Sequence, residues 1–191
     1  TIQRDYVQGR NEQSVVRDGF LGVLSKALSD TDGHHSLDLD FVYGSVLNGS
    51  GGSAFQPLDG QQRLTTLFLL HWYLAWRDRA EEDFKERFTI GTKSRFGYEV
   101  RPSSRDFINA LATHFPGVEA ANCSSLSDTI KDESWYFRGW RLDPTIQSAL
   151  DMLDTLHGLF ANTDGLYARL VDETKPAITF QLLELEKFGL S

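Results

Sequence analysis

The stretch "PLDGQQRLTTLFLLHWYLAW", residues 57–76, decides the fold. Residues 64–76 are apolar almost without interruption, which predicts a helix over about residues 59–79 that is covered on several sides. Asp59 alone would be enough to start such a helix, because a carboxylate accepts hydrogen bonds from the first backbone N–H groups. The stretch carries two glutamines and an arginine beyond that need, and we ask what they do.

Segments on both sides of this helix predict a small sheet. In "LDLDFVYGSVL", residues 37–47, apolar and acidic side chains alternate at first as in a half-buried strand. The "NGSGGS" that follows, residues 48–53, predicts a hairpin turn into a second strand over 54–58. Near the end of the chain Ile178, Phe180 and Leu182 alternate in the same way and predict a further strand.

Helices are predicted for most of the remaining chain. Residues 14–30 have helical spacing, with Arg17, Asp18 and Lys26 on the outer face and an apolar face of Val15, Val16, Phe20, Val23, Leu24 and Leu28. In the second half we expect a helix capped by Ser103 or Ser104 and an aromatic-rich helix within residues 125–140. Another helix should start at Asp143, with Pro144 in its first position.

These elements predict an α+β fold, a small mixed sheet backed by a mostly helical second half. We divide the chain into residues 1–100, which carry the turn at Asp59, and a helical extension, 101–191, that ends in a strand. Because a chain seldom stops directly after a core strand, we expect the C-terminus to be a cut point in a longer protein.

Composition limits the functional classes. The net charge of −8 over 191 residues argues against a general attraction to nucleic acid, so any phosphate binding must be local. The single cysteine, Cys123, cannot form an internal disulfide and fits a reducing compartment. The longest apolar run is far short of the roughly 20 residues that span a bilayer. We expect a cytoplasmic protein with no membrane contact.

The turn before the central helix has the chemistry of a phosphate site. A helix N-terminus presents unpaired N–H groups, Gly60 permits close approach, and Arg63 can donate two parallel hydrogen bonds to a phosphate. Asp59 would repel phosphate unless it caps the helix or holds a metal ion. Gln61 and Gln62 suit a base, a sugar or an attacking water. The alternative is a capping aspartate, a turn glycine and three solvated polar residues, and spacing alone leaves both open.

Beyond spacing, the motifs resemble a known family. "LDGQQRLTTL" at 58–67, "IQRDYVQGR" at 2–10 and "FVYG" at 41–44 are similar to the N-terminal domain of GmrSD-type, modification-dependent (Type IV) restriction proteins. The segments "YEVRPSSRDF" and "DPTIQSALDMLDTLH" are similar to one branch of that family, so the resemblance covers nearly the whole chain. It departs at Gln8, where many members have Trp, and in lacking the C-terminal HNH-like nuclease that usually follows.

The resemblance implies a ParB/sulfiredoxin-like fold that binds and hydrolyses a nucleoside triphosphate, GTP or ATP, with Mg²⁺, and that regulates DNA cleavage by a nuclease domain. It implies a catalytic set in which Asp59 also holds the metal, and a nucleotide-binding set that Gln3 and Arg4 join from the N-terminal motif. The catalytic set is Asp59, Gln61, Gln62 and Arg63, and the nucleotide-binding set is Gln3, Arg4, Gly60, Arg63 and Thr66. The alternatives are a non-enzymatic module for modified DNA or a partner subunit and, ranked last, a sulfiredoxin-like phosphoryl transferase, because Cys123 lies far from the turn.

Other clusters favour structural roles. We interpret His34 and His35, with Asp32, Asp38 and Asp40, as a surface loop and strand rather than a metal site. His71 is interpreted as a core histidine. Arg101, Ser103, Ser104 and Arg105 are read as a capped helix start rather than an anion nest. Trp135, Tyr136, Phe137 and Trp140, between Arg138 and Arg141, are read as core packing rather than a base-stacking surface.

Overall fold

The structure, a computed structural model of the whole chain, describes residues 1–30, 36–49 and 52–185. Its elements in chain order are η1 (Asn11–Gln13), α1 (Ser14–Ser29), β1 (Leu37–Gly49), β2 (Gly52–Pro57), α2 (Gln61–Arg77), α3 (Glu81–Phe88), β3 (Thr89–Ile90), β4 (Lys93–Ser94), α4 (Pro102–Thr113), η2 (Val118–Asn122), α5 (Leu126–Asp132), η3 (Arg138–Leu142), α6 (Pro144–Phe160), α7 (Leu166–Leu170) and β5 (Ile178–Glu184).

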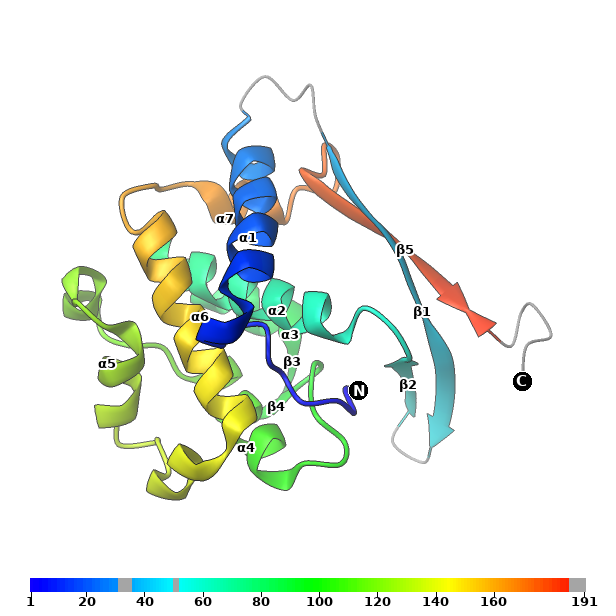
Figure 1. Cartoon of the computed structure of the whole chain (residues 1–191), viewed down its shortest axis with the longest axis horizontal. Helices are drawn as coiled ribbons and strands as arrows, with labels where there is room; N and C mark the ends of the chain where they lie inside the picture. The colour runs from blue at the N-terminus through cyan, green and yellow to red at the C-terminus, as the bar shows by residue number, and fades with distance from the viewer. Residues whose placement is uncertain (31–35, 50–51, 186–191) are drawn as a thin grey trace.

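The main sheet has three strands in the order β2-β1-β5. β1 pairs antiparallel with β2, and parallel with β5 from the far end of the chain, so the sheet is mixed as predicted. Figure 1 shows this sheet along one side of the molecule, with the helices gathered beside it. The α+β prediction is therefore confirmed, and so are the hairpin and the late strand; residues 50 and 51 of the predicted turn lie outside the described residues.

Helix α2 runs through the centre of the helical body. Its side chains from Thr65 to Trp76 are buried except for half-buried His71, as the apolar run predicted. The two indoles on this helix find polar partners, since Trp72 donates to the Leu111 carbonyl at 2.7 Å and Trp76 to the Pro116 carbonyl at 2.9 Å. One hydrophobic cluster contains residues from Ile2 to Ala177, and the division at residue 100 stays a prediction.

The predicted inner face of α1 is wrong in part. Leu24 and Leu28 are buried and Phe20 packs against the core, as predicted. Val15, Val16 and Val23 are 87%, 59% and 44% exposed, and the buried positions are Leu21, Leu24, Ala27 and Leu28. This helix carries apolar side chains over more than one face, so spacing alone cannot decide which face packs inward. The leucines, with the larger apolar volume, face the core and leave the valines outside.

The aromatic-rich segment is also not one helix. α5 ends at Asp132, and a separate 3₁₀ turn, η3, carries Trp140. Tyr136 and Trp140 are buried and pack edge-to-face against Phe107, which confirms their core role, whereas Phe137 is 65% exposed. Residues four positions apart also share one face of a helix, so the inward placement of Tyr136 and Trp140 agrees with the prediction although the helix itself is not formed.

Helix α4 starts without the predicted serine cap. It begins at Pro102, and the hydroxyls of Ser103 and Ser104 both donate to the carboxylate of Asp143. Asp143 caps α6 through the N–H groups of Thr145 and Ile146, as predicted. Burial raises the pKa of Asp143, but the bonds from the two serines and the two backbone N–H groups outweigh it and hold the pKa below the ordinary value.

Candidate functional site

The turn before α2 has an uncapped start. Gly60 is the N-cap residue in the left-handed region, with φ of 77°, and among the described residues no side chain accepts a hydrogen bond from the first turn. The Asp59 side chain, 54% exposed, lies 3.7 Å from the Arg63 guanidinium. Asp59 therefore does not cap the helix, in contrast to one of the roles expected for it.

The Gln61 amide holds the N-terminal segment. Its Oε1 accepts hydrogen bonds from the backbone N–H groups of Gln3, at 3.1 Å, and Arg4, at 2.8 Å. Its Nε2 donates to the carbonyl of Pro57 at 2.7 Å. Gln61 is buried, so these bonds supply partners that water cannot. The predicted approach of residues 3 and 4 to the turn is thus seen directly.

Gln62 repeats this arrangement one step along the segment. Its Oε1 accepts from the N–H groups of Val7, at 2.9 Å, and Gln8, at 3.2 Å, and its Nε2 donates to the Asp5 carbonyl. Two adjacent amides therefore hold the backbone of a segment more than 50 residues away in sequence. That is the structural use of the two extra glutamines.

The Arg63 guanidinium contacts an irregularity in strand β1. Asp40 has φ of 59°, and the register of β1 against β5 shifts between Asp38 and Phe41, as at a β-bulge. The guanidinium donates to the Leu39 carbonyl through Nη1 and to the Phe41 carbonyl through Nη2, at 3.0 Å for the latter. Arg63 thus stabilises the carbonyls on either side of the bulge while 29% of its side chain stays exposed.

Thr66 lies in the interior. Its hydroxyl bonds to the Tyr6 hydroxyl at 2.7 Å and donates to Oε1 of Gln8 at 2.8 Å, and all three residues are buried. Burial raises the pKa of Tyr6 far above its ordinary value, so the phenol is neutral. A direct contact between Thr66 and a ligand would require this segment to move.

The same N-terminal segment also contacts the start of α6. The N–H of Tyr6 donates to the Thr145 hydroxyl at 3.3 Å, and the N–H of Gly9 to the Ser148 hydroxyl at 3.1 Å. A Cβ on Gly9 would lie 1.8 Å from the Ser148 carbonyl oxygen, so only glycine fits there. The segment is therefore clamped between the first turns of α2 and α6, a role the sequence did not reveal for Gly9.

The accessible part of the turn is small. Of the predicted site residues Gln3, Arg4 and Asp59 are exposed and Gln62 and Arg63 partly so, whereas Gly60, Gln61 and Thr66 are buried. The Arg4 side chain makes no hydrogen bond or ion pair with the described residues. Within residues 1–30, 36–49 and 52–185 no group of three or more His, Cys, Asp or Glu could hold a metal ion. A metal at Asp59 would need most of its ligands from a bound phosphate and water.

Of the other predicted clusters, Asp32, His34 and His35 lie outside the described residues. Asp38 accepts a bond from the N–H of Asp40 at 3.0 Å, within the bulge. Nδ1 of His71 bonds to the Leu67 carbonyl at 2.7 Å, and burial lowers the His71 pKa to about 4, so the ring is a neutral core histidine as interpreted.

Neither the anion nest nor the capped start is found at residues 101–105. Arg101 forms an ion pair with Asp5, which ties α4 to the N-terminal segment. Arg105 lies 3.7 Å from the Asp106 carboxylate, and the two serines are bonded to Asp143 as described. Arg101, Ser103 and Ser104 therefore connect α4 to other parts of the chain, whereas the exposed Arg105 pairs only with its neighbour.

Cys123 has a basic neighbour that the sequence did not indicate. Its Sγ lies 3.9 Å from Nε2 of His157, a residue of α6, while Nδ1 of that ring lies 3.2 Å from the Tyr73 hydroxyl. Nε2 also lies 3.1 Å from the Cys123 carbonyl oxygen. Because a carbonyl oxygen can only accept a hydrogen bond, the proton of the neutral ring is placed on Nε2. With Nε2 protonated, His157 cannot take a proton from the thiol, and a nucleophilic role for Cys123 is not supported.

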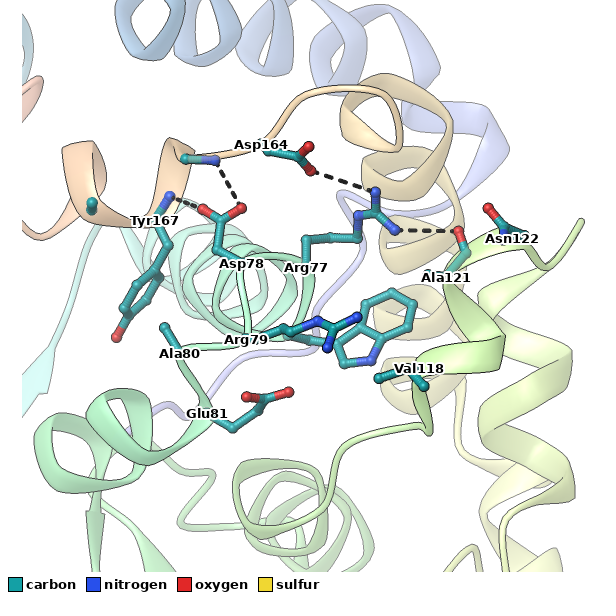
Figure 2. A pocket seen from close by; sticks show the side chains of 13 residues that line it. Arg77, Asp78, Arg79, Ala80, Glu81, Val118, Ala121, Asn122, Asp164 and Tyr167 are labelled. Atoms are coloured by element: carbon teal, nitrogen blue, oxygen red, sulfur yellow. Dashed lines mark hydrogen bonds and ion pairs between the residues drawn. The ribbon is translucent and has the colours of Figure 1, made fainter.

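A cavity of about 660 Å³ opens at the other end of α2. Figure 2 shows Asp78 directed at the first N–H groups of α7, and Arg77 directed at Ala121 and Asp164. Arg79 has φ of 57°, a conformation that side chains rarely adopt. The described residues that line this cavity include two arginines and three carboxylates, so the cavity has no net positive charge that would attract a phosphate.

The fold and the turn define an α+β domain in which a strand-to-helix turn carries a polar cluster bonded to the N-terminal segment. The family model described as "GmrSD restriction endonuclease, N-terminal domain" matches residues 1–181, and the chain belongs to this family. It is therefore a domain of a restriction protein. No curated protein and no solved structure matches the chain.

One further finding concerns membranes. Over the part of the chain that the structure describes, no helix has the length and apolar character needed to cross a bilayer.

Proposed function

We propose that this domain binds and hydrolyses a nucleoside triphosphate at the turn before α2, and that the nucleotide regulates DNA cleavage by a nuclease domain of the restriction protein. The observation that carries the proposal is the uncapped N-terminus of α2, a 17-residue helix whose first turn has no side-chain acceptor within the part of the chain that the structure describes. Such an end offers N–H groups and a partial positive charge to an anion.

Two cations support phosphate binding there. Arg63 is partly exposed beside the first turn, and the exposed Arg4 side chain has no partner among the described residues. The backbone N–H of Arg4 is fixed 2.8 Å from the Gln61 amide, which keeps the residue at the turn. Arg63 already donates to β1, so we assign it a supporting role and Arg4 the freer one.

Asp59 fits a single magnesium ligand. Its carboxylate is exposed and is not used as a cap, and Mg²⁺ is commonly held by one or two carboxylates together with substrate phosphates and water. When bound, the ion would neutralise phosphate charge. GTP and ATP are equally compatible with these residues.

Gln61 and Gln62 act as positioning residues in this proposal. Each amide has three backbone partners, so neither is free to orient an attacking water unless the N-terminal segment leaves. The same saturation favours the second candidate, a non-enzymatic module that recognises modified DNA or a partner subunit. The two candidates therefore differ in what is bound, a triphosphate or else modified DNA or a partner subunit, and in whether hydrolysis follows.

The test is titration of GTP and ATP, with and without Mg²⁺, combined with thermal melting. Arg4→Ala should weaken binding about 10- to 100-fold with little change in melting, because its side chain makes no internal bond. Asp59→Asn should remove the effect of Mg²⁺ only. Arg105→Ala, an exposed arginine away from the turn, is the matched control.

Two results would count against the proposal. If neither triphosphate binds under any of these conditions, the nucleotide site is wrong and the recognition module stands. If a triphosphate binds but phosphate release is absent, in this chain and in the protein with its nuclease domain, binding stands and hydrolysis is wrong.

A further inference from the structure

A second cavity, of about 520 Å³, lies between β2, the β3–β4 hairpin and the first turn of α2. Among the described residues that line it are two arginines and three phenylalanines, and no aspartate or glutamate. In a chain with a net charge of −8, such a lining stands out. Its volume is within the range of small-molecule sites.

One of the two arginines is free to bind an anion. Arg87 is already paired, with the Asp83 carboxylate at 2.8 Å and the Glu173 carboxylate at 3.2 Å. Arg95 has no carboxylate partner within the described part of the chain. Its backbone N–H donates to the Phe88 carbonyl at 2.7 Å and its Nε to the Thr89 carbonyl at 3.3 Å, so the hairpin fixes its position.

Two of the aromatic rings are prepared for stacking. Phe96 stacks on Phe68 with centroids 4.8 Å apart, and Phe88 stacks on Phe84 at 4.7 Å. Phe88 and Phe96 are both half-buried and line the cavity, so part of each ring stays accessible. Phe96 offers the freer ring, because Phe88 also contacts His71, with centroids 5.0 Å apart. Ile90, 68% exposed, extends the apolar surface at the rim.

We propose that this cavity binds a nucleotide unit, with the base against Phe88 and Phe96 and the phosphate at Arg95. A flat aromatic ring joined to an anion matches both halves of the lining, and base–aromatic stacking next to an arginine is a general mode of nucleotide binding. The unit could come from a free nucleotide or from a single strand of DNA. The inference goes beyond the proposed function, because it requires neither the turn at Asp59 nor Mg²⁺.

The test is calorimetric titration, without Mg²⁺, of dAMP, dGMP, dCMP and dTMP, and of a ten-nucleotide single strand of dT. At least one of these probes should bind saturably, and Arg95→Ala should weaken it about 10- to 100-fold, the effect of losing one charged hydrogen-bonding partner. Ile90→Asp should weaken it as well, by repulsion of the phosphate. Both positions are exposed, so the fold should survive these changes.

Lys93→Ala is the matched control, since it removes one charge from the same hairpin outside the cavity lining. Asp59→Asn and Arg4→Ala should leave this binding unchanged, which separates it from a failure of the triphosphate site. Binding of the mononucleotides identifies free nucleotide as the source, and binding of the strand alone identifies DNA. Absence of binding by every probe, or equal binding by wild type and Arg95→Ala, would overturn the proposal.

Discussion

Helices α2 and α6 are both 17 residues long and both have an aspartate at or next to the N-cap, yet they start in opposite ways. Asp143 caps α6 through two backbone N–H groups and gathers two serines of α4. Asp59 precedes a left-handed glycine, leaves α2 uncapped and turns toward Arg63. The start of α6 is internally complete, whereas the start of α2 keeps groups available to a ligand.

The two starts also share a task. Between them they hold the N-terminal segment, α2 through the amides of Gln61 and Gln62 and α6 through the hydroxyls of Thr145 and Ser148. A ligand at the start of α2 would therefore lie next to a segment that also contacts the start of α6. Polar residues at a helix start can therefore stabilise the fold and form a ligand site at the same time. Substitutions are needed to distinguish an effect on stability from an effect on binding.

The largest expected effect is that of a side chain at Gly9, where the N-terminal segment lies against α6. Gly9→Ala should destabilise the fold by about 3 kcal/mol or more, because the added Cβ would meet the backbone carbonyl of Ser148, which cannot move aside. Urea unfolding measures the change. The control is Gly22→Ala in α1, where nothing lies within 4 Å of the new Cβ, and where alanine should stabilise by about 0.5–1 kcal/mol. Equal stability of Gly9→Ala and wild type would mean that the segment is not clamped against α6.

Removing the side-chain amide of Gln61 should destabilise the fold nearly as much. Gln61→Ala leaves the N–H groups of Gln3 and Arg4 and the Pro57 carbonyl without their partner, and we expect a loss of about 2–3 kcal/mol in the free energy of unfolding. Gln3→Ala, which changes an exposed side chain on the same segment, should change little. If Gln61→Ala instead kept full stability and lost only nucleotide binding, Gln61 would belong to the site and not to the fold.

The sequence predicted the helices and strands better than the contacts between them. The apolar run of α2, the alternation in β1 and the Asp-Pro start of α6 are local signals, and each led to an element that the structure confirms. The glutamine contacts are not local, because their partners lie more than 50 residues upstream and are backbone groups, which carry no mark in the sequence. The prediction that residues 3 and 4 approach the turn came from a family resemblance and not from spacing.

The errors have the same origin. The valines wrongly placed on the inner face of α1 and the wrong roles of Ser103 and Ser104 both arose from treating a helix as if it were isolated. Tertiary packing buried Leu21 and left the valines exposed, and the Asp143 carboxylate, about 40 positions later, accepts hydrogen bonds from both serine hydroxyls. Likewise, the pairing of Cys123 with His157 depends on how η2 and α6 meet.

Replacing the capping aspartate of α6 should have a smaller effect. Asp143→Ala should lower stability at neutral pH by about 2 kcal/mol, since it removes a cap and the acceptor of two serine hydroxyls. Because the folded-state pKa of Asp143 lies below the ordinary value, the stabilisation is present above that value and is lost as pH falls through the folded-state pKa. Unfolding measured from pH 7 into the acid range, below the ordinary pKa of aspartate, should show the difference between the wild type and Asp143→Ala shrinking as pH falls. Asp106→Ala, an exposed aspartate of α4, should show no such convergence.

The smallest expected effect belongs to the other aspartate. Asp59→Ala should change the free energy of unfolding by less than about 0.5 kcal/mol, because Asp59 accepts no helix N–H and its exposed pairing with Arg63, at 3.7 Å, is of the kind that contributes little. A capping aspartate would instead cost about 1 kcal/mol on replacement, so the melting curve alone distinguishes the two roles. The same variant, titrated with triphosphate, should lose the Mg²⁺-dependent part of binding under the proposed function. A loss of stability comparable to that of Asp143→Ala would show that Asp59 does cap α2 in solution, and would remove the difference between the two helix starts on which the nucleotide site rests.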